Sequence, residues 1–237
     1  MKRIFDEFEQ VRIINLQERA DRRRAVIREL ARIGVEEIVP PISFYTARRL
    51  TLNDSFESGP KGSLISHREA IREAVASGAR NLLVLEDDVF FNEPHPGQID
   101  AIINAIRERS WDIIYFGYLK PDDVSLNGPL ARWTGGTIGG HFYGMNRPYM
   151  EKMLAFMDSF GKAELGMETT NPSFRDGAFN LYFERNPELN RFLVAPSLAR
   201  QRSSRTDLHR LSHFDRIPGL RDLTQMTRAL RNFIRRR

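Results

Sequence analysis

The sequence predicts one α/β domain whose mostly parallel central sheet is flanked by helices. The chain has 237 residues, 41% of them hydrophobic and 28% charged, which is typical of a globular protein with a substantial core. Short apolar runs alternate with longer segments of helical character, and this alternation favours a parallel sheet covered on both faces. Three consecutive acids directly follow one apolar run, which is where α/β proteins bind their ligands.

Each predicted element has its own local signal in the sequence. The first strand is the apolar run VRIINL, and the arginine-rich helix after it stops at Gly34. The next helix has Ser63 as its N-cap and Gly78 as its C-terminal break. The predicted strands cover residues 11–16, 39–45, 81–87, 112–118, 135–145 and 192–199, the last of them shortly before Gln201. The predicted helices cover residues 21–32, 62–77, 99–109 and 148–157.

Composition excludes several classes of protein. Cysteine is absent, which excludes disulfides and thiolate metal sites and is compatible with a reducing compartment. No apolar stretch approaches the roughly 20 residues that span a bilayer. The N-terminal residues MKRIFDEFEQ carry acids where a signal peptide needs an apolar run. We therefore expect the protein to stay in the cytoplasm.

The basic charge is concentrated in the C-terminal part of the chain. The formal net charge is +5, but residues 190–237 alone hold twelve arginines against three aspartates. A main domain at 1–216 is therefore not basic overall, and we expect no nucleic-acid partner. Residues 217–237 combine apolar residues at helical spacing with arginines, which predicts a basic amphipathic helix. Such a helix can lie on an anionic membrane surface or dock on protein, and both interpretations remain open.

The acidic triplet Glu86-Asp87-Asp88 is the strongest chemical signal. Three carboxylates after a buried strand are costly unless a positive charge neutralises them. Strand alternation predicts that Glu86 and Asp88 point to one face, roughly 7 Å apart, and that Asp87 points to the other. Such a pair suits Mg²⁺ or Mn²⁺, which complete their shell with substrate phosphates. The alternative is a solvated acidic turn at the strand end.

An ordered set of segments resembles glycosyltransferase family 25, the bacterial lipopolysaccharide glycosyltransferases related to collagen galactosyltransferases. The set covers the chain from about Val11 to Leu208. The sequence departs from the family pattern at Ser63, where cysteine is frequent, and at FRDGAFN, which matches a late acidic motif only loosely. The segments are INLQERADRRR from Ile14, GSLISHREAIREAV from Gly62, LVLEDDVFF from Leu83, WDIIYFG from Trp111, GGHFYGMNRPYMEKML from Gly139 and APSLARQRSSRTDL from Ala195.

The resemblance implies a GT-A type fold and metal-dependent transfer of a hexosyl unit from a nucleotide sugar. UDP-galactose is the first expectation for the donor, and a glycan or lipid-linked glycan of the cell surface is the expected acceptor. The triplet would then act as the DxD motif, with Asp88 and Glu86 as ligands of Mn²⁺ or Mg²⁺. The expected donor-binding residues are Asn15, Leu16, Arg19, Arg22, Ser66, His67, Glu86, Asp87 and Gln201.

Other interpretations of these donor-site residues remain open. Arg19 and Arg22 can pair with phosphate in bidentate geometry or lie on an exposed helix face. His67 can contact the donor or serve as a structural hydrogen bonder. Either His209 or His213 is a candidate third metal ligand, or a surface residue.

The acceptor side of the reaction needs a base. Inversion at the anomeric carbon requires a carboxylate or imidazole within hydrogen-bond reach of the acceptor hydroxyl. Asp176 is the first candidate because it precedes an apolar helical stretch, although an ordinary N-cap has the same pattern. Glu168 and His141 are the alternatives.

Two rival functions fit parts of the sequence. A sugar nucleotidyltransferase also combines an α/β sheet, carboxylates, metal and nucleotide, but it normally carries a glycine-rich loop with lysine near the first strand. The segment INLQERADRRR has neither feature. A non-enzymatic adaptor that binds anionic lipid or nucleic acid through the basic tail is the second rival.

Overall fold

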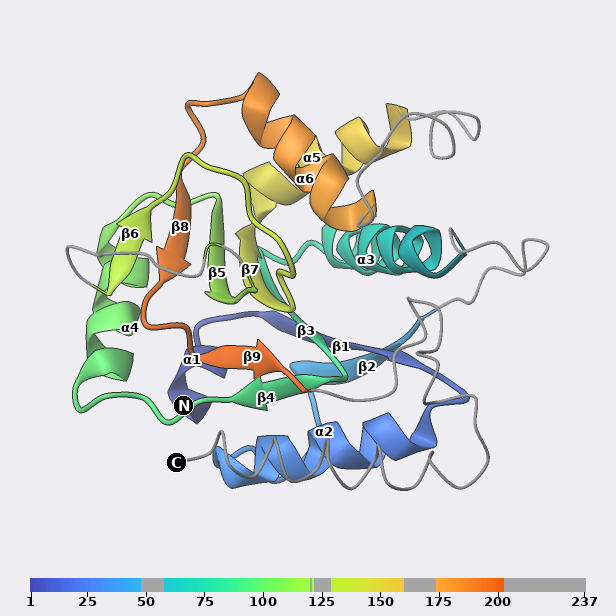
Figure 1. Ribbon diagram of the computed structural model, residues 1–237, viewed down its shortest axis with the longest axis vertical. Coiled ribbons are helices and arrows are strands. Elements are labelled where there is room, and N and C mark those ends of the chain that lie inside the picture. Colours follow the sequence, from blue (N-terminus) through green and yellow to red (C-terminus); the bar gives the residue numbers. More distant parts are fainter. Residues whose placement is uncertain (48–57, 120, 122–128, 160–173, 203–237) are drawn as a thin grey trace.

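The computed structural model describes residues 1–47, 58–119, 121, 129–159 and 174–202 (Figure 1). In the segment 58–119 the side chains are described from residue 62 onward, and in the segment 174–202 from residue 176 onward. The predicted division at residue 216 and the predicted basic helix at 217–237 lie outside the described residues. So do Glu168, His209 and His213, three of the candidate site residues.

A single sheet forms the centre of the described chain, in the order β2-β1-β3-β7-β5-β8-β6. Strand β9 extends it by pairing with β5, and β4 pairs with β9. The strands are β1 (Gln10–Leu16), β2 (Ile42–Ala47), β3 (Asn81–Glu86), β4 (Val89–Phe91), β5 (Ile113–Gly117), β6 (Leu130–Arg132), β7 (Phe142–Asn146), β8 (Arg191–Val194) and β9 (Ala199–Gln201).

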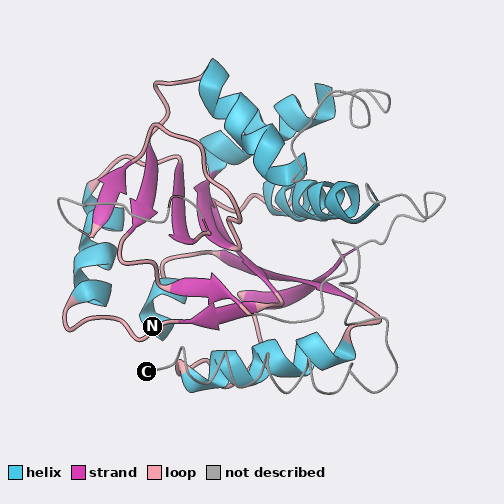
Figure 2. Cartoon of the chain, in the orientation of Figure 1, coloured by secondary structure: helices cyan, strands magenta, loops and turns pink. Residues whose placement is uncertain are grey.

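Helices cover both faces of this sheet (Figures 1 and 2). On one face lie α3 (Ser58–Ala76), α5 (Arg147–Ser159) and α6 (Phe174–Arg185). On the other lie α1 (Lys2–Phe5), α2 (Ala20–Arg32) and α4 (Gln98–Glu108). The predicted α/β class with flanking helices is therefore confirmed. No described helix is long and apolar enough to cross a membrane.

The sheet is mixed, which corrects the prediction of a mostly parallel one. Strands β2, β1 and β3 are parallel, but β7 runs antiparallel between β3 and β5. Strand β7 is buried on both faces, so its apolar sequence has the same character as a buried parallel strand. The predicted strand at 135–145 is correspondingly shorter, because regular pairing begins only at Phe142.

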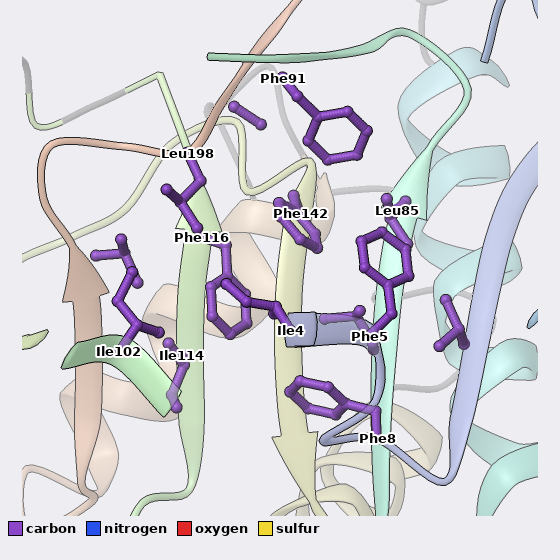
Figure 3. Packing of buried hydrophobic residues seen from close by; sticks show 14 of the residues in the cluster. Ile4, Phe5, Phe8, Leu85, Phe91, Ile102, Ile114, Phe116, Phe142 and Leu198 are labelled. Carbon is purple, nitrogen blue, oxygen red and sulfur yellow. The ribbon is translucent and has the colours of Figure 1, made fainter. Parts of the chain in front are cut away.

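Strand alternation divides the apolar side chains between two cores. In β3, Leu83 and Leu85 face the core under α1, α2 and α4, whereas Leu82 and Val84 face the core under α3, α5 and α6. The first core is rich in phenylalanine rings packed edge to face or tilted, with centroids 5.0–6.3 Å apart (Figure 3). These rings belong to Phe5, Phe8, Phe91, Phe116 and Phe142. Because the sheet is packed on both faces by these two cores, the ends of its strands are held in defined positions.

Candidate donor site at the ends of β1 and β3

The ends of β1 and β3 are joined by hydrogen bonds. The two strands are parallel, with Ile14 opposite Glu86. Beyond this pair, the Asp87 backbone N–H donates to the Ile14 carbonyl at 3.1 Å, and the Asn15 side-chain amide donates to Asp87 Oδ2 at 2.7 Å. Ligands of α/β proteins bind at this edge, where the carboxyl ends of parallel strands meet. The structure therefore brings Asn15 and the acidic triplet together, as predicted.

Asp87 is held by the protein from two sides. Its Oδ1 accepts a hydrogen bond from Arg22 Nη1 at 3.0 Å, and Arg22 lies in the first turn of α2. Burial raises the pKa of Asp87, and the contacts with Arg22 and Asn15 offset part of this rise. The carboxylate is nearly inaccessible to solvent, and its contacts tie β1, α2 and the turn after β3 together. Asp87 thus anchors the site.

Asp88 has a different environment, although it also lies near Arg22. Its Oδ2 is 3.7 Å from Arg22 Nη1, whereas its buried Oδ1 finds no hydrogen-bond partner among the described residues. Burial first, and then the negative charge of Glu86, raise the pKa of Asp88 to about 7. Unpaired buried carboxylate oxygens are costly, so this group favours a bound cation.

A divalent cation fits Asp88 when a substrate supplies most of the ligands. The described residues contain no group of three His, Asp or Glu side chains arranged to hold a metal. Mg²⁺ and Mn²⁺ are commonly held by one or two carboxylates together with water and substrate phosphates. The orphaned oxygen of Asp88 meets that requirement as a single protein ligand.

The predicted division of the triplet between two faces does not hold. Strand β3 ends at Glu86, and Asp87 and Asp88 form the turn that leads into β4. Strand alternation ceases to apply at such a turn, and both aspartates lie against the same guanidinium, that of Arg22. Glu86, by contrast, contacts α3 and β9.

The carboxylate of Glu86 is aligned by two contacts from distant segments. His67 Nε2 lies 3.3 Å from Oε1, and the Gln201 side-chain amide donates to Oε2 at 3.0 Å. His67 is itself buried in α3, and its Nδ1 lies 2.6 Å from the hydroxyl of Tyr143 on β7. The structure thus brings His67, Glu86 and Gln201 together, and it adds Tyr143, which the sequence analysis missed.

Arg202 is a second residue that sequence reasoning did not single out. Its backbone N–H donates to the Asp88 carbonyl at 2.6 Å, and its Nη2 donates to the Val89 carbonyl at 3.3 Å. Burial lowers the pKa of Arg202, while the charges of Glu29 and Asp88 act in the opposite direction. A guanidinium this close to the turn after β3 increases the positive charge around Asp88, together with Arg22.

Three predicted donor residues make local contacts at the border of the site. Arg19 forms a bidentate pair with Asp21, at 2.9 and 2.8 Å, and its hydrogen bond is the largest of the causes that lower the pKa of Asp21 to about 2. The Ser66 hydroxyl donates to the Gly62 carbonyl within α3 at 2.7 Å. Leu16 ends β1 and is half-buried. The hydrogen bonds of Arg19 and Ser66 stabilise the segments that border the triplet.

The loop before β7 links Asp176 to the triplet. Asp176, in the first turn of α6, accepts a hydrogen bond from the Gly139 backbone N–H at 2.8 Å. Two residues later, the His141 carbonyl accepts from the Glu86 backbone N–H at 2.9 Å. Gly117 is required beside this loop, because a Cβ there would lie 2.7 Å from His141 Nε2. The Asp176 carboxylate and the His141 backbone are therefore connected through this loop to Glu86, whereas Glu168, the third candidate base, lies outside the described residues.

Comparison with known proteins confirms the resemblance to glycosyltransferase family 25. No protein-family model matches the chain. A human protein named inactive glycosyltransferase 25 family member 3 is 27% identical over a match that covers 46% of this chain and 22% of that protein. A rat protein named probable inactive glycosyltransferase 25 family member 3 is 30% identical, over 37% of this chain and 15% of its own length. The chain thus spans less than a quarter of the length of these relatives.

Two solved structures are similar to the chain at 12% identity. The first is a glycosyltransferase involved in the glycosylation of the major capsid of PBCV-1, with a TM-score of 0.49 over 83% of this chain and 95% of that one. The second is a mannose-1-phosphate geranyltransferase from Thermus thermophilus, with a TM-score of 0.40 over 78% of this chain and 72% of that one.

Proposed function

We propose that this chain is a GT-A type glycosyltransferase that uses a divalent cation to bind a nucleotide-sugar donor at the ends of β1 and β3. The observation that carries the proposal is Asp88, whose buried Oδ1 lacks a partner among the described residues and whose pKa is raised to about 7. Perturbed carboxylates of this kind cluster at functional sites. The family resemblance of the segments around the triplet supplies the reaction class.

Asp88 and Glu86 have separate roles in donor binding in this proposal, and Asp87 anchors the turn that carries Asp88. Asp88 holds Mn²⁺ or Mg²⁺, and the cation offsets the negative charge that develops on the departing nucleoside diphosphate. Arg22 and Arg202, which flank Asp88, add positive charge on the protein side of the diphosphate. Glu86 faces the nucleoside, since His67 and Gln201 already align its carboxylate.

Asp176 is the proposed base for an inverting transfer. Its hydrogen bond from the Gly139 N–H fixes the carboxylate at the start of α6. From there it would accept the proton of an acceptor hydroxyl as that oxygen attacks the anomeric carbon.

The finer parts of the proposal concern substrates and location. We expect a UDP-hexose donor, galactose first, and a glycan acceptor of a cell-surface polysaccharide or lipopolysaccharide, either free or lipid-linked. The protein would work in the cytoplasm, with the basic residues 217–237 on the inner membrane surface or docked on protein. Because the human and rat relatives are named inactive, turnover itself is the property to measure.

The experiment measures release of UDP from UDP-galactose, UDP-glucose and UDP-N-acetylhexosamines, with Mn²⁺, with Mg²⁺ and with EDTA. Asp88→Ala should abolish metal-dependent turnover and metal-dependent donor binding. Asp100→Ala is the matched control, because that aspartate is exposed and pairs with Arg3 away from the site. Metal-dependent turnover that survives Asp88→Ala would contradict the proposal, and pyrophosphate release from a sugar 1-phosphate and a nucleoside triphosphate would support a nucleotidyltransferase instead.

A further inference from the structure

A chain of buried polar groups leads from β7 to the triplet. The Tyr143 hydroxyl lies 2.6 Å from His67 Nδ1, and His67 Nε2 lies 3.3 Å from Glu86 Oε1. Tyr143 has no solvent exposure and His67 almost none. Nothing in the reaction as proposed above requires either group to touch a substrate.

When the imidazole is neutral, the chemistry of Tyr143, His67 and Glu86 determines which group donates and which accepts in each of the two hydrogen bonds. The ionised Glu86 carboxylate can accept hydrogen bonds but cannot donate them, so His67 must present its proton on Nε2 toward Oε1. Nδ1 is then the acceptor nitrogen, and the Tyr143 hydroxyl must donate to it. The tyrosine thereby selects the tautomer of His67 that can hold Glu86.

Packing keeps both rings of this chain in place. The rings of His67 and Tyr143 are stacked, with centroids 5.8 Å apart and planes 22° apart. Phe179 of α6 packs edge-on against Tyr143 at 5.8 Å. Neither ring can turn without disturbing the core under α3, α5 and α6, so the hydrogen-bond direction is fixed by the fold.

We propose that Tyr143 and His67 are positioning residues that orient Glu86 to accept a hydrogen bond from a ribose hydroxyl of the donor. This inference rests on the proposed function, because it requires a nucleoside diphosphate in the site. The Gln201 amide holds the second oxygen of the same carboxylate at 3.0 Å, so the plane of the carboxylate is set from both ends. A group oriented in this way discriminates between ribose and deoxyribose, because a missing hydroxyl leaves a desolvated acceptor unpaired.

The test compares the affinity for UDP with that for 2′-deoxy-UDP and 3′-deoxy-UDP, measured by calorimetry in Mn²⁺. Tyr143→Phe removes one oxygen and keeps the ring contacts. We expect it to lower the preference for ribose by about three- to tenfold, with little change in deoxy-UDP binding. Gln201→Met, which removes the donor to the other oxygen, should lower the preference in the same direction.

Tyr149→Phe is the matched control, because Tyr149 is equally buried in the same core and its hydroxyl has no hydrogen-bond partner among the described residues. It should leave the preference for ribose unchanged. A merely structural role for Tyr143 would weaken UDP and both deoxy forms alike, and that result would overturn the inference while leaving the proposed function intact. If the wild type in Mn²⁺ shows no binding of UDP, GDP, ADP or CDP beyond the signal of Mn²⁺ without nucleotide, the proposed function fails and this inference fails with it.

Discussion

Arg22 Nη1 lies 3.0 Å from Asp87 Oδ1, and this contact ties the first turn of α2 to the turn that follows β3. Both side chains are largely buried, with 13% and 8% of their surfaces exposed. The same guanidinium reaches Asp88 at 3.7 Å. One arginine therefore positions the turn through Asp87 and sets the electrostatic environment of the carboxylate that would bind the cation.

Replacing Arg22 with methionine should destabilise the protein by about 2–4 kcal/mol, because Asp87 loses its charged partner in a buried setting. Urea unfolding at neutral pH measures the change. Arg147→Met is the control, since the Arg147–Glu151 pair is exposed and such pairs contribute about 0–1 kcal/mol. Equal losses in the two variants would show that the Arg22–Asp87 contact has no special role.

Asp88→Asn should stabilise the metal-free protein at pH 8 but not at pH 4. The folded-state pKa of Asp88 is about 7, above the ordinary value of 3.8, so the folded protein binds a proton more tightly than the unfolded chain does. The stability that this proton contributes is fully present below about pH 4 and is lost as the pH rises to about 7. Asparagine cannot ionise, so the Asp88→Asn variant does not lose this stability as the pH rises.

We expect the melting temperature of Asp88→Asn in EDTA to exceed that of the wild type at pH 8, by about 2–4 °C for each kcal/mol of stability gained. The two proteins should converge as the pH falls toward 4. Adding Mn²⁺ and UDP at pH 8 should then stabilise only the wild type, by mass action. A constant difference at all pH values would mean that the carboxylate is not destabilised by burial.

Asp176→Asn separates the role of base from that of anchor. Asparagine keeps an oxygen that can accept from the Gly139 N–H but removes the basic carboxylate. If Asp176 is the base, kcat for transfer should fall by about 10²–10⁴ while the melting temperature changes little. Full activity in Asp176→Asn, combined with instability in Asp176→Ala, would assign the residue to anchoring alone and leave His141 and Glu168 as the candidate bases.

Gly144→Ala should cost about 1–3 kcal/mol, because a Cβ at this position would lie 2.5 Å from the Phe8 ring in the phenylalanine-rich core. That ring is held by Trp111 and Phe116 and has little room to move. Gly177→Ala provides the opposite control. It lies in α6, and a Cβ added there would have no atom of the described residues within 4 Å outside its own helix backbone, so alanine should raise stability by up to about 1 kcal/mol.

Local signals were sufficient for most helices. The helices predicted at 21–32, 99–109 and 148–157 correspond to α2, α4 and α5 within two residues at either end. Apolar periodicity and glycine stops decide these elements, and both are encoded within a few neighbouring residues. The strand before the triplet was predicted one residue too long, because Asp87 belongs to the turn. That single residue changed the predicted faces of Asp87 and Asp88.

Contacts between distant segments could not be predicted from the sequence. Gln201 was chosen as a polar residue after a strand, but its contact with Glu86 depends on the pairing of β9 with β4. Tyr143 has no local signal that separates it from other core aromatics, since its importance depends on His67, 76 residues earlier. The antiparallel direction of β7 likewise depends on the path of the chain around the sheet. The residue types of the site were therefore predictable, whereas their partners were not.

The pairing of β9 with β4 and β5 has a consequence for biosynthesis. Strand β1 and the triplet leave the ribosome early, but Gln201 emerges 115 residues after Glu86, and Arg202 follows it. A nascent chain that has already paired β1 with β3 thus lacks the segment that aligns Glu86 and backs Asp88. During synthesis the proposed donor site is therefore completed only when β9, the last of the described strands, joins the sheet, so a shorter nascent chain would lack part of the proposed site.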